Sequence, residues 1–539
     1  MTFATLTRGS TLFRHLDGTK WRQMVQAKED QIITEKTKPI TNEEFYRLFK
    51  PVRNTFRLYD PVSILSASLG ILFRQEAKHL DQIRKQPWIH LVLLKWVFMD
   101  EEADRKGRPK INEIQFDHLL NRVYKLSWVG RKPSQFEDLT LFFRAIAAQQ
   151  FLYQQSINLD AVARQNALFL NVSFDHFFQR AFFKAAGLPL SSFVKLSLCL
   201  MSYFMDADST PVFKRSFFAP IEHEIAPEHV DAFLKGISIN LDNLPDALRA
   251  SDSKMRRVTE FIEETPFLGF PLVRQVDSYC CIYPQILTSN LGHFIFDTLK
   301  KADPEKFRLN FGRRFEAYIG GLIASANLTY SDESALEKKL EGKGKLVDFL
   351  VVDGGANIYI EAKAVEMAPR GKATHLRDVV RGATASSLLK AVEQAHAINK
   401  RVLEASNPDS IITARPDAYL IVVTYKELYI GNGMSLGNAV GEQALNRISD
   451  SYSESVRIPL RRMFFLTVEE LEKLLQLVQE KRIGLLDALK RAELADSNPA
   501  SRKFMFSQHL AEWPESIDMP SPHADKFIPV IDGIIDAFQ

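Results

Sequence analysis

Two short stretches, Lys345–Val352 (KLVDFLVV) and Asn357–Lys363 (NIYIEAK), decide how this chain is expected to fold. Both are rich in β-branched and aromatic residues, which favour strands, and a Gly-Gly pair lies between them. If the chain reverses symmetrically about the two glycines, Asp348 faces Glu361, whether the loop has two residues or four. Because side chains alternate along a strand, Lys363 lies on the same face as Glu361. The sequence therefore predicts a hairpin that brings together two carboxylates and an ammonium group.

The predicted pairing of Asp348 with Glu361 indicates a metal site. Like charges that lie directly opposite each other ordinarily destabilise a strand pair. A divalent cation bound between the two carboxylates would remove this repulsion, and hard oxygen ligands are those that Mg²⁺ prefers. We therefore expect the hairpin to bind a divalent cation.

The spacing of these residues resembles a known signature. Asp348, twelve further residues and then Glu361-Ala-Lys363 at the end of an apolar strand are similar to the motif of the PD-(D/E)XK nuclease superfamily. The resemblance implies that Asp348 and Glu361 bind Mg²⁺ or Mn²⁺. It also implies that Lys363 orients the attacking water and stabilises charge on the phosphate. The first position of the motif is often Pro in the family and is Val347 here.

Two helices that flank the hairpin supply further candidate site residues. In this family the preceding helix usually contributes a Glu, and Glu316 lies at the edge of the apolar stripe of 311–322. The resemblance implies that Glu316 is a further metal ligand or a base. The following helix often carries a Gln, which Gln394 supplies in the predicted helix 386–403, although Ile398 stands where one subgroup has Tyr. A solvated carboxylate at 316 and a plain surface amide at 394 stay open as alternatives.

Basic residues follow directly after the hairpin. Between Lys363 and Arg401 there are eight basic and three acidic residues, whereas the whole chain has a net charge of only +3. The Gly, Ser and Thr content of this segment is typical of a loop that contacts phosphates. The predicted substrate-binding residues are Arg370, Lys372, Arg377 and Arg381. A solvated basic loop is the alternative interpretation.

Length and patterning predict three regions. With 539 residues, 46% hydrophobic and 25% charged, the chain is typical of a folded protein with room for about three domains. We expect an α/β fold, with a restriction-endonuclease-like core in which helices flank a mixed sheet, and a large all-α N-terminal domain. The predicted domains are a helical domain at 1–265, a nuclease-like domain at 266–466 and a helical extension at 467–539.

Local patterns place further elements in these regions. The chain changes to strand and turn patterns near residue 266, and the apolar run 417–425 has the length of a buried strand. Another strand is predicted at 463–466. Thr467-Val-Glu-Glu470 then forms a capping box that opens a helix to about residue 479.

Several other classes of protein are disfavoured. The stretch 342–345 (GKGK) lacks the spacing and the Ser/Thr of a phosphate-binding P-loop, and no H-E-x-x-H motif occurs. Three cysteines offer no even disulfide framework, which favours a reducing cytoplasm. The longest uncharged apolar run, 61–73, is shorter than the roughly 18 residues that a membrane span needs. We expect no membrane segment.

The resemblance implies a metal-dependent endonuclease that hydrolyses phosphodiester bonds in DNA or RNA. Stand-alone nucleases of this type with a large helical N-terminal domain resemble bacterial anti-phage effectors. In that class the helical domain would sense a phage protein or hold the nuclease inactive. An abortive-infection toxin that cleaves tRNA is one alternative. A non-catalytic nucleic-acid-binding protein that keeps the nuclease fold is another, and the intact Asp348, Glu361 and Lys363 disfavour it.

Overall fold

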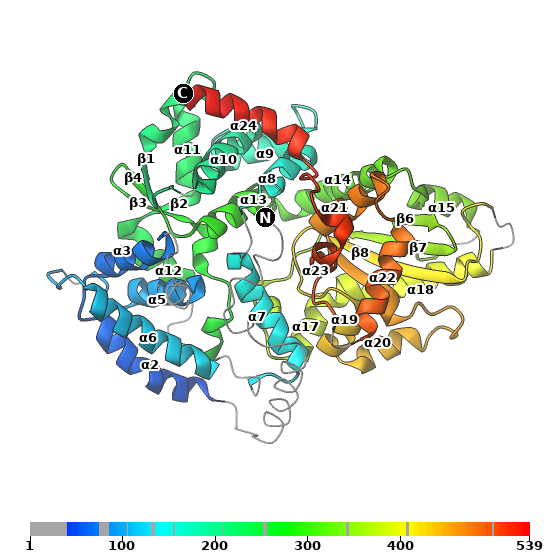
Figure 1. The fold of residues 1–539 in the computed structure, drawn as a ribbon, viewed down its shortest axis with the longest axis horizontal. Coiled ribbons are helices and arrows are strands. Elements are labelled where there is room, and N and C mark those ends of the chain that lie inside the picture. The colour runs from blue at the N-terminus through cyan, green and yellow to red at the C-terminus, as the bar shows by residue number, and fades with distance from the viewer. Residues whose placement is uncertain are drawn as a thin grey trace.

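The structure is a computed structural model of a mixed α/β protein with two lobes (Figure 1). The helical lobe comprises residues 40–302 and the C-terminal helix, and the sheet lobe comprises residues 304–513. Two long helices, α13 (Pro284–Ala302) and α14 (Pro304–Ser325), follow each other at the junction of the lobes. The described residues are 40–74, 86–104, 106–130, 135–154, 157–206, 208–251, 256–340, 344–405, 409–498 and 501–538.

A five-stranded mixed sheet in the order β5-β6-β7-β8-β9 forms the centre of the sheet lobe. The pairs β5–β6 and β6–β7 are antiparallel, and the pairs β7–β8 and β8–β9 are parallel. The strands are β5 (Thr329–Asp332), β6 (Phe349–Asp353), β7 (Ala356–Lys363), β8 (Asp417–Thr424) and β9 (Met463–Thr467). The hairpin and the strands predicted near 417–425 and 463–466 are therefore confirmed.

The β6–β7 hairpin has a two-residue turn. Asp353 pairs with Ala356, so that only the two glycines connect the strands. Gly354 has a φ of +53°, a left-handed conformation that favours glycine. The register runs from this turn to Phe349 opposite Ile360, and its continuation places residue 348 opposite residue 361, as predicted.

Helices cover both faces of the five-stranded sheet, because the alternating side chains of its strands enter two different apolar cores. One core contains β-strand residues such as Ile358 and Ile421 together with α14, α21 (Val468–Gln479) and α22 (Leu485–Ser497). The other core contains Tyr359 and Val422 together with the helices α15 (Glu333–Lys339), α18 (Lys390–Leu403), α19 (Gly433–Val440) and α20 (Glu442–Ser449).

Two helical predictions in this lobe are confirmed. The predicted stripe of α18 and the turn before it is buried, at Leu388, Ala391, Ala395, Ile398 and Val402. The capping box of α21 is also present, since Thr467 and Glu470 exchange hydrogen bonds across the first turn.

A second sheet corrects the prediction of an all-α N-terminal domain. Its four strands, in the order β1-β4-β3-β2, lie in the helical lobe, and two of them precede residue 265. The strands are β1 (Val212–Lys214), β2 (Ser238–Asn240), β3 (Leu272–Gln275) and β4 (Ser278–Cys281). The strands expected after residue 266 therefore exist, but they pair with the N-terminal region. The predicted domain boundary near residue 265 lies between β2 and β3, two neighbouring strands of this sheet.

Helices make up most of the remaining helical lobe. They are α2 (Asn42–Phe56), α3 (Pro61–Leu72), α5 (Pro87–Met99), α6 (Glu113–Gly130), α7 (Leu139–Gln154), α8 (Asp160–Gln165), the π-helix η2 (Asn166–Leu170), α9 (Phe177–Ala186), α10 (Leu190–Met205), α11 (Pro227–Ile237) and α12 (Leu244–Ser251). Among the described residues no single helix is long and apolar enough to cross a membrane. In the part of the chain that the structure describes, one pair of helices, α9 and α10, passes that test when taken together, and the pair is bent by 63°.

The C-terminal region is shared between the lobes. After α21 and α22, helix α23 (Phe506–Glu512) packs against α21 and β9 of the sheet lobe. The last helix, α24 (Ala524–Phe538), instead contacts α8 and α10 and lies on the helical lobe (Figure 1). The residues after 466 therefore do not form a separate helical unit.

The basic segment after the hairpin differs from the expected loop. It forms the short helix α16 (Pro369–Lys372), then α17 (Arg377–Thr384) and a π-helix, η7 (Ala385–Leu389), that leads into α18. Buried residues between the basic positions explain the difference. Val380 and Thr384 of α17 are buried, and Val380 packs in the core that contains α18, which favours helix over loop.

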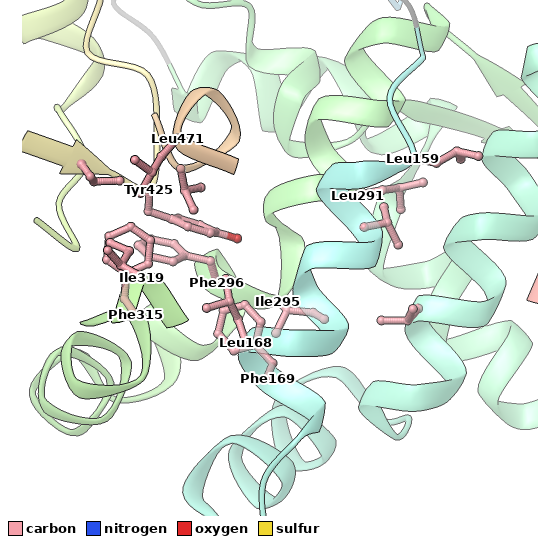
Figure 2. Packing of buried hydrophobic residues seen from close by; sticks show 14 of the residues in the cluster. Leu159, Leu168, Phe169, Leu291, Ile295, Phe296, Phe315, Ile319, Tyr425 and Leu471 are labelled. Atoms are coloured by element: carbon pink, nitrogen blue, oxygen red, sulfur yellow. The ribbon is translucent and has the colours of Figure 1, made fainter. Parts of the chain in front are cut away.

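A continuous apolar core joins the two lobes. Tyr425, directly after β8, stacks on Phe296 of α13 with ring centroids 4.8 Å apart. Phe169 of η2 stacks on Phe311 of α14 at 5.5 Å. Figure 2 shows Tyr425 and Leu471 of the sheet lobe beside side chains of α13 and η2 from the helical lobe. The lobes therefore share one core and are not independent domains.

A fragment that begins at residue 266 should not fold. It would lack β1, β2 and the helical-lobe part of the shared core, and it would leave the buried Glu472 without its ion-pair partner Arg164. Removing one partner of a buried ion pair costs about 3–5 kcal/mol. Circular dichroism and size-exclusion chromatography of the fragment, beside the full chain, test this. A monodisperse fragment with a cooperative thermal transition would show that residue 265 is a true domain boundary.

Candidate active site

Asp348 and Glu361 lie opposite each other at the open end of the β6–β7 hairpin. The backbone N–H of Asp348 donates to Glu361 Oε2 at 3.3 Å, and the N–H of Ala362 donates to Asp348 Oδ2 at 2.6 Å. Each carboxylate thus accepts a hydrogen bond from the backbone of the other strand. Glu361 is only 2% exposed, whereas Asp348 is partly exposed. The predicted pairing of the two carboxylates therefore places one buried and one accessible acid together.

Lys363 and Gln394 hold the buried Glu361 carboxylate. The Lys363 ammonium donates to Glu361 Oε1 and also to Gln394 Oε1, the latter at 3.2 Å. Gln394 Nε2 in turn donates to Glu361 Oε1 at 3.0 Å and to the carbonyl of Leu346 at 2.9 Å. Gln394 is therefore not a plain surface amide, because its side-chain amide forms hydrogen bonds with Lys363, Glu361 and the backbone of Leu346.

Glu316 reaches the same cluster from α14. One turn later in α14, Gly320 lies against Phe349 of β6, and a Cβ at this glycine would lie 3.1 Å from the ring. The missing side chain lets the helix approach the strand closely. Carboxylate oxygens of Glu316, Glu333 and Asp348 all lie within 4.8 Å of one another. All five predicted catalytic residues, Asp348, Glu361, Lys363, Glu316 and Gln394, therefore converge.

Glu333 is an acidic residue at this site that the sequence reasoning missed. It is the first residue of α15 and directly follows β5. Asp332 pairs with Phe349, so the continued register places residue 333 opposite residue 348. The only signal in the sequence was the acidic pair at 332–333. The strand before it is four residues long and largely polar, so its pairing with β6 could not be recognised.

Crowding of carboxylates shifts their pKa values upward. Burial, and then the charge of Glu361, raise the pKa of Asp348 to about 8. Burial and Glu333 raise the pKa of Glu316, and burial and Glu361 raise the pKa of Glu333. Each shift shows that negative charge is disfavoured here without a further cation. A divalent cation would reverse this, because it stabilises the ionised form of each acid that it contacts.

The arrangement can therefore hold a hard divalent cation. Of the predicted ligands, Asp348 and Glu316 offer neighbouring carboxylate oxygens of the kind that Mg²⁺ and Mn²⁺ bind. Both oxygens of Glu361, the third predicted ligand, accept hydrogen bonds within the protein. Glu333 adds a further oxygen donor on the exposed side. Lys363 supplies one positive charge beside these acids, and its ammonium donates to Glu361.

The predicted substrate-binding residues lie on α16 and α17, and three have internal partners. Lys372 pairs with Glu264 at 2.5 Å, Arg377 pairs with Asp138 at 2.7 Å, and Arg381 donates to the carbonyl of Val440 at 2.9 Å. These contacts join the segment to the helical lobe and to α19. The side chain of Arg370 lies outside the described residues. Binding of nucleic acid by this segment stays a prediction.

Comparison with known proteins adds no family assignment. No protein-family model matches the chain, and a search of curated proteins found no significant match. The functional argument therefore depends on the site itself.

Proposed function

We propose that this protein is a Mg²⁺- or Mn²⁺-dependent nuclease that hydrolyses phosphodiester bonds in nucleic acid. One observation carries the proposal: four separate elements bring Asp348, Glu361, Lys363, Glu316 and Gln394 to one point, the end of the hairpin. The order of elements, with a helix before the hairpin and a helix and a parallel strand after it, supports a restriction-endonuclease-like core of the PD-(D/E)XK type.

The proposed mechanism assigns each side chain a role. Asp348, Glu361 and Glu316 would hold the cation, which supplies Lewis acidity and lowers the pKa of water when bound. Lys363 is placed to orient the attacking water and to stabilise negative charge on the phosphate. Gln394 fixes the Lys363 ammonium and the Glu361 carboxylate relative to each other through its two hydrogen bonds.

The substrate and biological role extend the same proposal. We propose an endonuclease that acts in the cytoplasm on DNA or RNA as a bacterial anti-phage effector, with a phage protein as activator. Cleavage of tRNA in abortive infection is the second candidate within this class. A non-catalytic nucleic-acid-binding protein is the candidate of another class. The convergence of Asp348, Glu316 and Glu361 with Lys363 and Gln394 at one point favours the enzyme.

Replacing Lys363 by Ala, or Glu361 by Gln, should abolish cleavage. Loss of a group that activates water or stabilises transition-state charge typically reduces rates by about 10²-fold or more. Purified variants are incubated with plasmid, single-stranded DNA and total tRNA, each with Mg²⁺, Mn²⁺ or EDTA. Lys400→Ala, an exposed lysine of α18, is the matched control and should keep wild-type cleavage. Wild-type rates in both site variants, with any substrate, would disprove the assignment.

Replacing Asp348 by Asn should change the pH dependence of stability in EDTA. The raised pKa of Asp348 means that the folded state holds this proton more tightly than the unfolded state. The resulting stability is fully present below about pH 4 and is lost as the pH rises through about 8. Asn cannot ionise, so Asp348→Asn should gain in Tm relative to wild type between pH 5 and 9. A Tm difference that is constant over this range would contradict the crowded-carboxylate interpretation.

In Mn²⁺, wild type should become more stable than Asp348→Asn, the opposite of the order expected in EDTA. At pH 8, wild type should gain RT ln(1 + [Mn²⁺]/Kd) from binding to the folded state, whereas Asp348→Asn should lose most of that gain. Thermal melts in EDTA and in millimolar Mn²⁺ measure both effects. Equal Mn²⁺-induced shifts in the two proteins would show that Asp348 is not a ligand.

A further inference from the structure

The helix that carries Glu316 makes polar contacts on both sides of that residue. On α14, Arg314 precedes Glu316 by two residues and Tyr318 follows it by two. Residues four apart lie on one side of a helix, so Arg314 and Tyr318 share a face that is turned away from Glu316. Both side chains make polar contacts that lead to one short segment, α8–η2 (residues 160–170).

Arg314 caps the end of the π-helix η2. Its guanidinium donates to the carbonyls of Ala167 at 2.9 Å, Leu168 at 3.3 Å and Asn171 at 2.7 Å. The last carbonyls of a helix have no partner within the helix, and a cation at this end also interacts favourably with the helix dipole. One side chain that satisfies three carbonyls fixes the distance between η2 and α14.

Tyr318 makes the second contact through a buried ion pair. Its hydroxyl donates at 2.6 Å to Oε1 of Glu472, which lies on α21 of the sheet lobe, and Arg164 of α8 binds both oxygens of Glu472 at 2.7 Å. Arg164 is 6% exposed and Glu472 is 2% exposed. A bidentate pair in such a site is strongly oriented, because any displacement leaves a charge buried without its partner. The Tyr318 hydroxyl is therefore fixed relative to α8.

We propose that α8–η2 positions Glu316 for the metal site, with Arg314 and Tyr318 as positioning residues. This inference rests on the nuclease function proposed above and names the route by which the helical lobe acts on it. Stacking of Phe169 on Phe311 adds an apolar contact between the same two elements. Glu316 lies on a rigid helix, so a shift of α14 moves its carboxylate relative to Asp348 on the hairpin. The helical lobe thereby sets the affinity of the site for its cation.

Arg314→Gln tests the proposal because positioning and simple electrostatics predict opposite signs. Removing a positive charge near an acidic site would by itself strengthen cation binding. Loss of a group that orients a ligand typically weakens metal binding by about 10–100-fold. We therefore expect Mn²⁺ binding to weaken by about 10-fold or more, measured by isothermal titration calorimetry on the full chain at pH 8. Arg313→Gln, the exposed neighbouring arginine, removes the same charge and is the matched control.

Measuring the same substitution in a Glu316→Gln variant separates an effect on ligand position from a general destabilisation of the fold. In Glu316→Gln the ligand is already lost, so adding Arg314→Gln should weaken Mn²⁺ binding no further. Tyr318→Phe removes one hydroxyl, is the milder variant if Arg314→Gln does not fold, and should act in the same direction by a smaller factor. Equal weakening in both backgrounds, or unchanged binding in Arg314→Gln and Tyr318→Phe, would overturn the inference while leaving the nuclease proposal intact. Absence of Mn²⁺ binding to wild type would overturn both.

Discussion

The buried Glu361 carboxylate is the constraint on which the rest of the site depends. A charge that is almost fully removed from water is stable only when hydrogen bonds and opposite charge surround it. Lys363, Gln394 and the backbone of Asp348 supply these partners. Each partner comes from a different part of the local fold, so the strand register and the position of α18 are both set around one acid. Asp348 lies beside this acid, and its own burial and then the charge of Glu361 raise its pKa.

The two lobes are coupled because α14 belongs to both environments. Its apolar stripe, including Phe311 and Phe315, packs in the core that extends from the helical lobe to the five-stranded sheet. Its Glu316 reaches the hairpin, and its Arg314 reaches η2. A helix that contacts the helical lobe through Arg314 and carries a site residue two positions away offers a simple physical route for regulation. Large rigid rotation of independent domains is not required.

Much of the site was predictable because it depends on local rules. The Gly-Gly turn and the alternation of a strand were sufficient to place Asp348 opposite Glu361. Helical periodicity predicted the two flanking helices, and the family resemblance singled out Glu316 and Gln394 on them. These rules need only short stretches of sequence. They succeed where the packing of one element against its immediate neighbours determines the structure.

The rest of the fold depended on contacts between distant segments. β1 and β2 are three residues long and gain their stability from pairing with β4 and β3, which a single sequence does not reveal. The partner of β5, and therefore the place of Glu333, is hidden for the same reason. The basic segment before residue 386 was misread as a loop because its Gly and Thr residues outweighed Val380, which packs in the core. Tertiary packing overrides local preference in each case.

The most direct test of the central claim is a crystal structure of the protein soaked in Mn²⁺, with diffraction data recorded at the manganese absorption edge. The anomalous signal locates the ion without assumptions about activity. The account predicts a Mn²⁺ ion in contact with the carboxylates of Asp348 and Glu361 or Glu316, with Lys363 beside it. Manganese bound only at other sites, with these carboxylates free of metal, would contradict it.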